Sequence, residues 1–164
     1  MSTDPEWLER LRQSGLRLDC EGRWWHEGQL VEHPGLTHAL HRWLDREDGR
    51  YVVRWGEEYA YVEVEDAPFL VRTLRLDQGR IWLALSDDSE QELDYDSLTV
   101  GRDNALYCRV RQGRFDARFG WQAQQILAQW LDEDAELGFV LRAGGGLWPI
   151  RPRPPSGDLG RHPS

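Results

Sequence analysis

A short sequence pattern occurs twice in this chain and constrains its fold more than any other feature. Residues 40–45 read Leu-x-x-Trp-Leu-Asp, and residues 127–132 repeat the same pattern. Each copy is followed by an apolar run and then glycine: Tyr51–Arg54 before Gly56, and Phe139–Arg142 before residues 144–146. We therefore predict one fold unit that occurs twice, with the interface between the two copies as a favourable place for a ligand.

Apolar spacing predicts a helix in each copy. After Pro34, the residues Leu36, Leu40, Trp43 and Leu44 are spaced i, i+4, i+7 and i+8, which places them on one helical face. This helix is expected to end near Gly49, and its counterpart to run from about Trp121 to Asp132. Alternating apolar residues and glycine turns predict a hairpin on both sides of each helix: Leu16–His33, Tyr51–Val64, Leu106–Arg118 and Gly138–Ile150.

These elements predict an α+β protein of duplicated hairpin-helix-hairpin units with short antiparallel sheets. A proline-capped apolar stripe predicts an N-terminal helix in residues 1–15. The first unit is expected at 16–70, and a central strand pair with the second unit at 71–150. Residues 151–164 are rich in proline, glycine and arginine, which predicts a disordered tail.

Charge and composition exclude several functions. The net charge of −9 disfavours binding to extended duplex nucleic acid or to an anionic membrane. All basic residues are arginine, so a Walker lysine and a Schiff-base lysine are excluded. Two distant cysteines, no signal peptide and no apolar run of about 20 residues predict a reduced, cytoplasmic protein.

Several longer strings of residues resemble one bacterial protein family. They are residues 22–28, 46–53 and 64–69 in the first half, and 110–113 and 144–150 in the second half. These strings are similar to the family catalogued as domain of unknown function 1285 (DUF1285), and the string Glu65–Phe69 is the most specific of them. The chain departs from the family at Ser86–Asp88, where the family tends to carry a threonine-asparagine pair, and in a shorter linker.

The resemblance implies a duplicated α+β core whose second half is superficially similar to pleckstrin-homology folds. It also implies a nucleotide-like or nucleic-acid-based ligand between the two units and a role in signal transduction. No enzymatic activity is established for the family.

An arginine-rich hairpin is the most distinctive candidate for anion binding. Arg109, Arg111, Arg114 and Arg118 surround a single acid, Asp116, and arginine binds phosphate or carboxylate with paired donors. Ion pairing with nearby acids on a solvated strand is the favoured alternative. Arg54 and Arg142 occupy equivalent positions in the repeat and could each face a ligand.

Aromatic and acidic residues complete the candidate site. Trp24 and Trp148 could stack on a nucleotide ring, although packing in the core is the favoured alternative. Trp24 and Trp25 face opposite sides of a strand, so only one of them can join the core. His26 follows them, and Asp66 could accept a ligand hydroxyl group or cap a chain bend.

Metal binding and catalysis have little support. His38, His41 and Asp45 share a helical face that could hold a metal, but a solvated face is favoured because no fourth ligand accompanies them. The acids in residues 87–96 lack the glycine and final glutamate of a calcium loop. No catalytic motif stands in the chain, so we predict no catalytic residue, no metal and no cofactor.

The sequence therefore predicts a non-enzymatic ligand-binding or sensor protein with a small anionic, nucleotide-like ligand at the interface between its units. A protein-interaction adaptor without a small-molecule site is the alternative. The residues of the Leu-x-x-Trp-Leu-Asp repeat are interpreted as scaffold, and function is assigned to residues in which the copies differ. The candidate ligand-binding residues are Trp24, His26, Arg54, Asp66, Arg109, Arg111 and Trp148.

Overall fold

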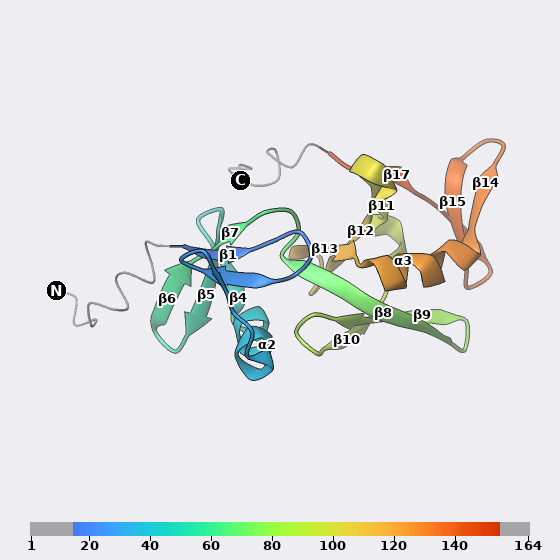
Figure 1. Cartoon of the computed structure of the whole chain (residues 1–164). Helices are drawn as coiled ribbons and strands as arrows, with labels where there is room; N and C mark the ends of the chain where they lie inside the picture. Colours follow the sequence, from blue (N-terminus) through green and yellow to red (C-terminus); the bar gives the residue numbers. More distant parts are fainter. Residues whose placement is uncertain (1–14, 155–164) are drawn as a thin grey trace. The chain divides into compact units, whose positions relative to one another are not determined.

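The computed structural model describes residues 15–154, which form two compact units divided between Pro68 and Phe69 (Figure 1). The first unit contains residues 15–68 of the described chain, and the second contains residues 69–154. The helix predicted in residues 1–15 and the tail beyond residue 154 lie outside the described residues, except for Gly15.

The first unit is built from two small sheets and one helix. One sheet has the strand order β3-β2-β1-β7, in which only the β1–β7 pair is parallel. The other has the order β4-β5-β6 and is antiparallel. The elements are β1 (Leu16–Leu18), β2 (Trp24–His26), β3 (Gln29–Leu30), α2 (Pro34–Arg42), β4 (Leu44–Glu47), β5 (Arg50–Trp55), β6 (Glu58–Tyr61) and β7 (Glu63–Val64).

Helix α2 is shorter than the apolar spacing predicts. The His33 side chain accepts a hydrogen bond from the backbone N–H of Leu36 and caps the helix start, next to Pro34. The helix ends at Arg42, and Leu44–Glu47 is strand β4 rather than helix. Pairing with β5 satisfies the backbone of this segment and buries Leu44, which is only 4% exposed. The prediction of a helix up to Gly49 was therefore wrong.

The same correction applies in the second unit. Helix α3 (Trp121–Leu127) and the 3₁₀ turn η3 (Ala128–Trp130) end before β14 (Leu131–Asp134), which pairs antiparallel with β15 (Gly138–Ala143). In both copies the helix stops at the tryptophan of the repeat, and the following Leu-Asp begins a strand. A strand edge that needs a partner overrides the helical preference of this segment.

A hydrogen bond between two buried rings holds the core of the first unit. The indole Nε1 of Trp24 donates to Nδ1 of His41 at 2.9 Å, and the two rings meet edge to face. Trp24 is fully buried and His41 is 1% exposed. The prediction that His41 lies on a solvated helical face was therefore wrong, because the buried indole N–H requires an acceptor from α2.

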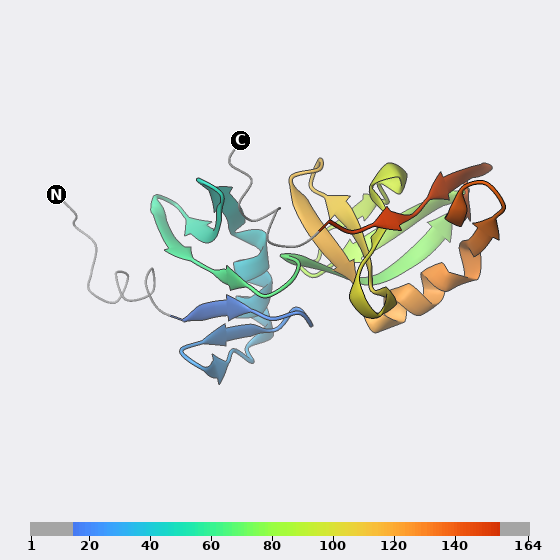
Figure 2. The same cartoon turned by 90° about the horizontal axis from the view of Figure 1, so that it is seen from above.

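The second unit is built around a seven-stranded sheet with the order β10-β9-β8-β13-β12-β11-β17 (Figure 2). Its strands are β8 (Phe69–Asp77), β9 (Arg80–Leu85), β10 (Glu90–Glu92), β11 (Thr99–Val100), β12 (Leu106–Val110), β13 (Phe115–Phe119) and β17 (Arg151–Pro152). Two 3₁₀ turns, η1 (Tyr95–Ser97) and η2 (Arg102–Asn104), flank β11. The central strand pair β8–β9 and the hairpin β12–β13 agree with the predicted strands.

Strand β17 lies in the segment predicted to be a disordered tail. Arg151 and Pro152 pair parallel with Thr99 and Val100. The next residue, Arg153, places its guanidinium 3.7 Å from the centre of the Tyr107 ring. These contacts tie the segment to the edge of the sheet, and the absence of apolar periodicity gave no sign of them.

Helix α3 and a second sheet complete this unit. The backbone N–H of Gly120 donates to the carbonyl of Val71, so α3 begins against β8. After η3 the chain forms the antiparallel sheet β14-β15-β16, in which β16 is Gly146–Pro149. Each unit thus contains a helix followed by a three-stranded antiparallel sheet.

The protein is a mixed α+β structure, as the sequence predicts. A common origin of the two units and a pleckstrin-homology likeness of the second stay predictions. None of the helices in residues 15–154 has both the length and the apolar character needed to cross a bilayer.

We expect His41→Leu to destabilise the first unit, because the buried N–H of Trp24 then loses its acceptor. The expected loss in free energy of unfolding is about 1–3 kcal/mol, measured by urea denaturation. The double variant Trp24→Phe/His41→Leu removes both polar partners and should recover part of this loss. Equal stability of the wild type and His41→Leu would contradict a structural role for this hydrogen bond.

Candidate functional site

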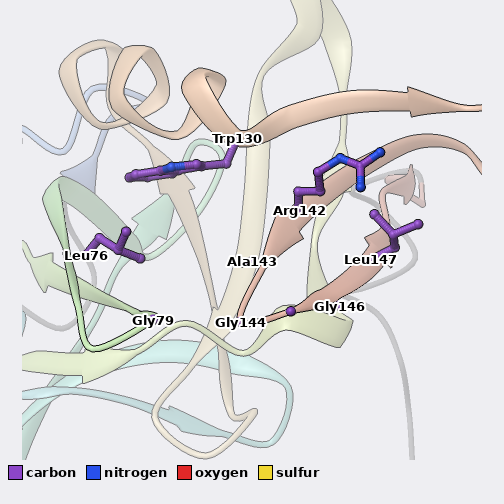
Figure 3. Close-up of a pocket in the computed structure, with 9 residues that line it drawn as sticks. Leu76, Gly79, Trp130, Arg142, Ala143, Gly144, Gly146 and Leu147 are labelled. Carbon is purple, nitrogen blue, oxygen red and sulfur yellow. The ribbon is translucent and has the colours of Figure 1, made fainter.

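A cavity of about 410 Å³ lies in the second unit beside the β15–β16 hairpin (Figure 3). Its walls come from the end of β8, the β8–β9 turn, the end of η3 and the tip of the hairpin. The residues that carry its chemistry are Leu76, Gly79, Trp130, Arg142 and the glycines 144–146. All of these elements belong to one compact unit, so the fold of that unit alone forms the cavity.

The apolar wall consists of an aromatic ring and an aliphatic side chain. Trp130 is the last residue of η3, where the chain leaves the helix for β14, and its side chain is half-buried. Leu76 is near the end of β8 and is 50% exposed. Figure 3 shows the Trp130 ring and Leu76 on the same side of the β15–β16 hairpin. Together they offer an apolar surface to a planar group.

The floor of the cavity is a glycine turn. Gly144 and Gly145 have φ values of 60° and 81°, and the flanking residues Ala143 and Gly146 pair across the hairpin. A two-residue turn with both φ values positive strongly favours glycine. A methyl group on Gly144 would lie 3.5 Å from the carbonyl oxygen of Gly79, so the turn closely approaches the β8–β9 turn. Peptide groups therefore stand at the cavity surface without side chains to cover them.

Arg142 supplies positive charge at the edge of this cavity. Its Nε donates to Oδ2 of Asp132 at 2.9 Å, and both side chains are about half exposed. A backbone hydrogen bond from Glu133 and the guanidinium of Arg142 lower the pKa of Asp132 below its usual value. In Figure 3 the guanidinium extends on the same side as Leu147, away from the Trp130 ring. Exposed pairs of this kind contribute little to stability, so Arg142 can exchange Asp132 for another anion.

The arginines predicted to bind an anion are engaged with acids of the same unit. Arg111 pairs with Asp87, whose side chain is 2% exposed, and its guanidinium lies 4.8 Å from the centre of the Phe69 ring. Arg109 donates to the carbonyl of Gly113 at 2.9 and 3.1 Å and to Asp116 at 3.3 Å. These contacts favour the structural interpretation of both arginines, and their role in ligand binding stays a prediction.

Three predicted residues of the first unit also have internal contacts. Trp24 is fully buried against His41 and does not reach solvent. Arg54 pairs with Glu47 and lies 3.6 Å from Asp45, at the face of the β4–β5–β6 sheet. Asp66 is half-buried in the segment after β7. None of these three residues lines the first-unit cavity of about 330 Å³, and their role in ligand binding stays a prediction.

Trp25 and Trp148 have different surroundings. The indole Nε1 of Trp25 donates to Asp19 at 2.9 Å, and the guanidinium groups of Arg17 and Arg23 lie over its ring. This network explains why the tryptophan that cannot join the core is retained at the surface. Trp148 stacks on Tyr95 with 5.2 Å between ring centroids, and its buried Nε1 has no acceptor among the described residues.

Two predicted residues lie at or near a cavity of their own unit. His26 lines an apolar cavity of about 330 Å³ in the first unit. A methyl group on Gly146, which lines the second-unit cavity, would lie 3.7 Å from Nε1 of Trp148. Trp148 therefore lies next to a residue of that cavity without lining the cavity itself.

Sequence reasoning missed Trp130 because the repeat was interpreted as scaffold. Trp43, its counterpart in the repeat, lines the first-unit cavity, and Trp130 lines the second-unit cavity. Both stand where the helix gives way to a strand, so neither is held on the packed helical face. The Asp48-Gly49 pair was a signal for this boundary, since Asp-Gly favours a two-residue hairpin turn.

Nucleophilic and metal chemistry find little support in the described residues. Burial raises the pKa of the Cys108 thiol far above its usual value, which disfavours the reactive thiolate. Within residues 15–154, no three His, Cys, Asp or Glu side chains are grouped so that they could hold a metal ion.

Comparison with solved structures places the fold among DUF1285 proteins. A DUF1285 family protein from Silicibacter pomeroyi DSS-3 superposes with a TM-score of 0.70 at 19% identity, covering 90% of this chain and 84% of that chain. One from Shewanella baltica OS155 gives a TM-score of 0.56 at 18% identity, covering 67% and 87%. The chain shares the fold of these proteins. No family model and no curated protein matches its sequence.

We expect the Arg111–Asp87 pair to make stability depend on pH. Burial alone would raise the pKa of Asp87, but hydrogen bonds from Ser89 and Arg111 outweigh it and hold this pKa below its usual value. A carboxyl whose folded-state pKa is lowered stabilises the fold above its unfolded-state pKa, and this contribution is lost as pH falls through the lower folded-state pKa. The loss should therefore occur below about pH 4.

Arg111→Gln should lower the free energy of unfolding by about 3 kcal/mol at pH 7, because Asp87 stays buried without its cation. The difference from the wild type should shrink toward pH 2 in urea denaturation. The matched control is Arg72→Gln, at an exposed position of β8. A difference that does not change with pH would contradict this assignment.

Proposed function

We propose that this protein binds a small anionic ligand with a planar ring, of the nucleotide-like class, in the cavity of its second unit. In this proposal the protein is a non-enzymatic, cytoplasmic sensor, and ligand binding serves signal transduction. The observation that carries the proposal is the combination of the half-buried Trp130, the glycine tip and Arg142 around one cavity of about 410 Å³.

The Trp130 ring and Leu76 account for the planar part of the ligand. Stacking on an aromatic ring contributes about 1–3 kcal/mol per base and accepts any base, because every base has a π face. Leu76 lies on the same side of the hairpin (Figure 3) and adds apolar contact.

The hairpin tip and Arg142 account for the anionic part. The turn at Gly144 and Gly145 carries no side chains, so a phosphate can approach the backbone closely. Arg142 donates to Asp132 through its Nε. Its two Nη groups donate no hydrogen bond to any of residues 15–154. These groups are suited to receive phosphate oxygens with paired donors.

This location differs from the interface between units that the sequence favours, which stays a prediction. It does not require Arg109 or Arg111, which pair with acids inside the second unit. The adaptor alternative predicts instead that no small molecule binds with useful affinity and that a protein partner is recovered.

We expect the affinity for adenosine monophosphate (AMP) to fall at least about fivefold in Trp130→Ala, because the stacking surface is lost. Isothermal titration calorimetry on the full chain measures this change. The matched control is Trp121→Ala, which removes a tryptophan that is 79% exposed and does not line the cavity. Equal losses in the two variants, or no binding of AMP by the wild type, would contradict the proposal.

The variant Arg142→Gln separates the contribution of the ligand's charge to affinity from the contribution of its ring. We expect this variant to weaken AMP about threefold and to leave adenosine unchanged, because only AMP carries the anion. Arg72→Gln, on an exposed position of β8, should change neither affinity. An equal effect of Arg142→Gln on AMP and adenosine would show that the arginine acts on the fold rather than on the phosphate.

A further inference from the structure

A second cavity, of about 330 Å³, lies within the first unit. Strands β1, β2 and β5, helix α2 and the residues that follow β3 and α2 contribute its walls. Seven of its eight lining residues are aliphatic or tryptophan, and the eighth is His26. It is therefore an apolar cavity with a single polar side chain, which is a common composition for a small-molecule site.

The exposed fractions of the lining side chains distinguish a buried floor of this cavity from an exposed mouth. Leu16 and Leu40 are 5% and 8% exposed, and Val53 is fully buried, so these three form the floor. Leu36 is 45% exposed and Trp43 is 39% exposed, so these two lie at the mouth. Large apolar side chains that stay exposed beside an apolar cavity indicate a surface that gains from being covered.

His26 is the observation that points to a polar group on the ligand. Its Nε2 is buried and has no hydrogen-bond partner among the described residues. A buried polar atom without a partner is costly, and such atoms in folded proteins normally have one. A hydroxyl group both donates and accepts, so it can satisfy Nε2 in either tautomer of the imidazole.

Two tryptophans favour an aromatic ligand over an aliphatic chain. The Trp43 and Trp55 rings lie 5.9 Å apart between centroids and are tilted by 38°, and both line the cavity. Aromatic rings prefer offset or edge-to-face contacts with one another, and a third ring can add to this pair. The walls contain no aspartate, glutamate or arginine side chain, so a strongly charged ligand is disfavoured.

We infer that the first unit binds a small uncharged aromatic molecule with one hydroxyl group, with the ring against Trp43 and Trp55 and the hydroxyl on Nε2 of His26. This site is separate from the cavity proposed for the anionic ligand, because the two share no residue. It therefore stands or falls independently of the proposed function.

The test compares 4-ethylphenol with ethylbenzene, which has the same shape without the hydroxyl group. Both are titrated into the full-length protein, and amide and indole NMR signals report the affinity and the location. We expect shifts at His26, Trp43 and Trp55, and a preference for 4-ethylphenol of about fivefold from one additional hydrogen bond. His26→Phe should bring the two affinities to within experimental error of each other while ethylbenzene still binds.

A second variant keeps the test decisive if His26→Phe does not fold. Leu36→Glu places a charge at the exposed mouth and should weaken both probes at least about tenfold. Its matched control is Leu137→Glu, in the second unit, where the leucine is 49% exposed and lies outside both cavities. Leu137→Glu should bind both probes like the wild type.

Three results would overturn the inference. The first is a hydroxyl preference that survives in His26→Phe, and the second is a set of NMR shifts outside the first-unit cavity. The third is failure of both probes to bind the wild type, with binding gained in the full-length variant Trp7→Ala/Leu8→Ala/Leu11→Ala. That result would make the apolar residues at the start of the chain the occupant instead of a ligand.

Discussion

Strand β8 is the element on which the second unit and its cavity depend. It pairs with β9 on one edge and with β13 on the other, and so joins two hairpins into one sheet. Its Val71 carbonyl accepts from Gly120 and sets the start of α3, and its far end carries Leu76 into the cavity wall. Helix α3 leads through Trp130 into the β14–β16 sheet. The position of β8 therefore sets where both Trp130 and Leu76 lie relative to the glycine tip. The site therefore follows from strand pairing, and the residues of the cavity are distant in sequence.

Arginine chemistry explains why the most basic segment is a weak candidate for the ligand site. The chain carries 20 basic residues, all arginine, and 29 acidic residues, so acids outnumber the arginines that can pair with them. Arg111 is held by the buried Asp87, and Arg109 bonds to a backbone carbonyl as well as to Asp116. Among residues 15–154, the partner of Arg142 is the exposed Asp132, and exchanging this exposed pair for another anion costs little. The availability of a cation matters more than the local density of cations.

Much of the fold could be predicted from the sequence, because strands, turns and helix starts leave local signals. Pro34 at the start of α2, the Gln78-Gly79 turn and the β12–β13 hairpin all appear where their residues indicate. The ends of both helices could not be predicted from apolar spacing, since the pairing of β4 with β5 and of β14 with β15 decides them. The burial of His41 was missed for a related reason: its partner Trp24 lies 17 residues away.

The candidate site was harder to predict than the fold. Repetition made Trp43 and Trp130 look like scaffold, yet each lines a cavity in its own unit. A residue at the junction between helix and strand does not have to point toward the packed face of the helix, and the spacing of apolar residues in the sequence does not reveal this. The glycines at residues 144–146 were predicted to form a hairpin turn, but the approach of this turn to Gly79 depends on tertiary structure.

The central claim is that a planar, anionic ligand lies between Trp130 and the tip of the β15–β16 hairpin. Intermolecular nuclear Overhauser effects in the AMP-bound protein test it most directly. We predict contacts from the adenine H2 and H8 protons to the Trp130 ring and the Leu76 methyl groups, with amide shifts at Gly144 and Gly145. Contacts from these protons to other residues, with Trp130 and the glycine amides unchanged, would contradict the account.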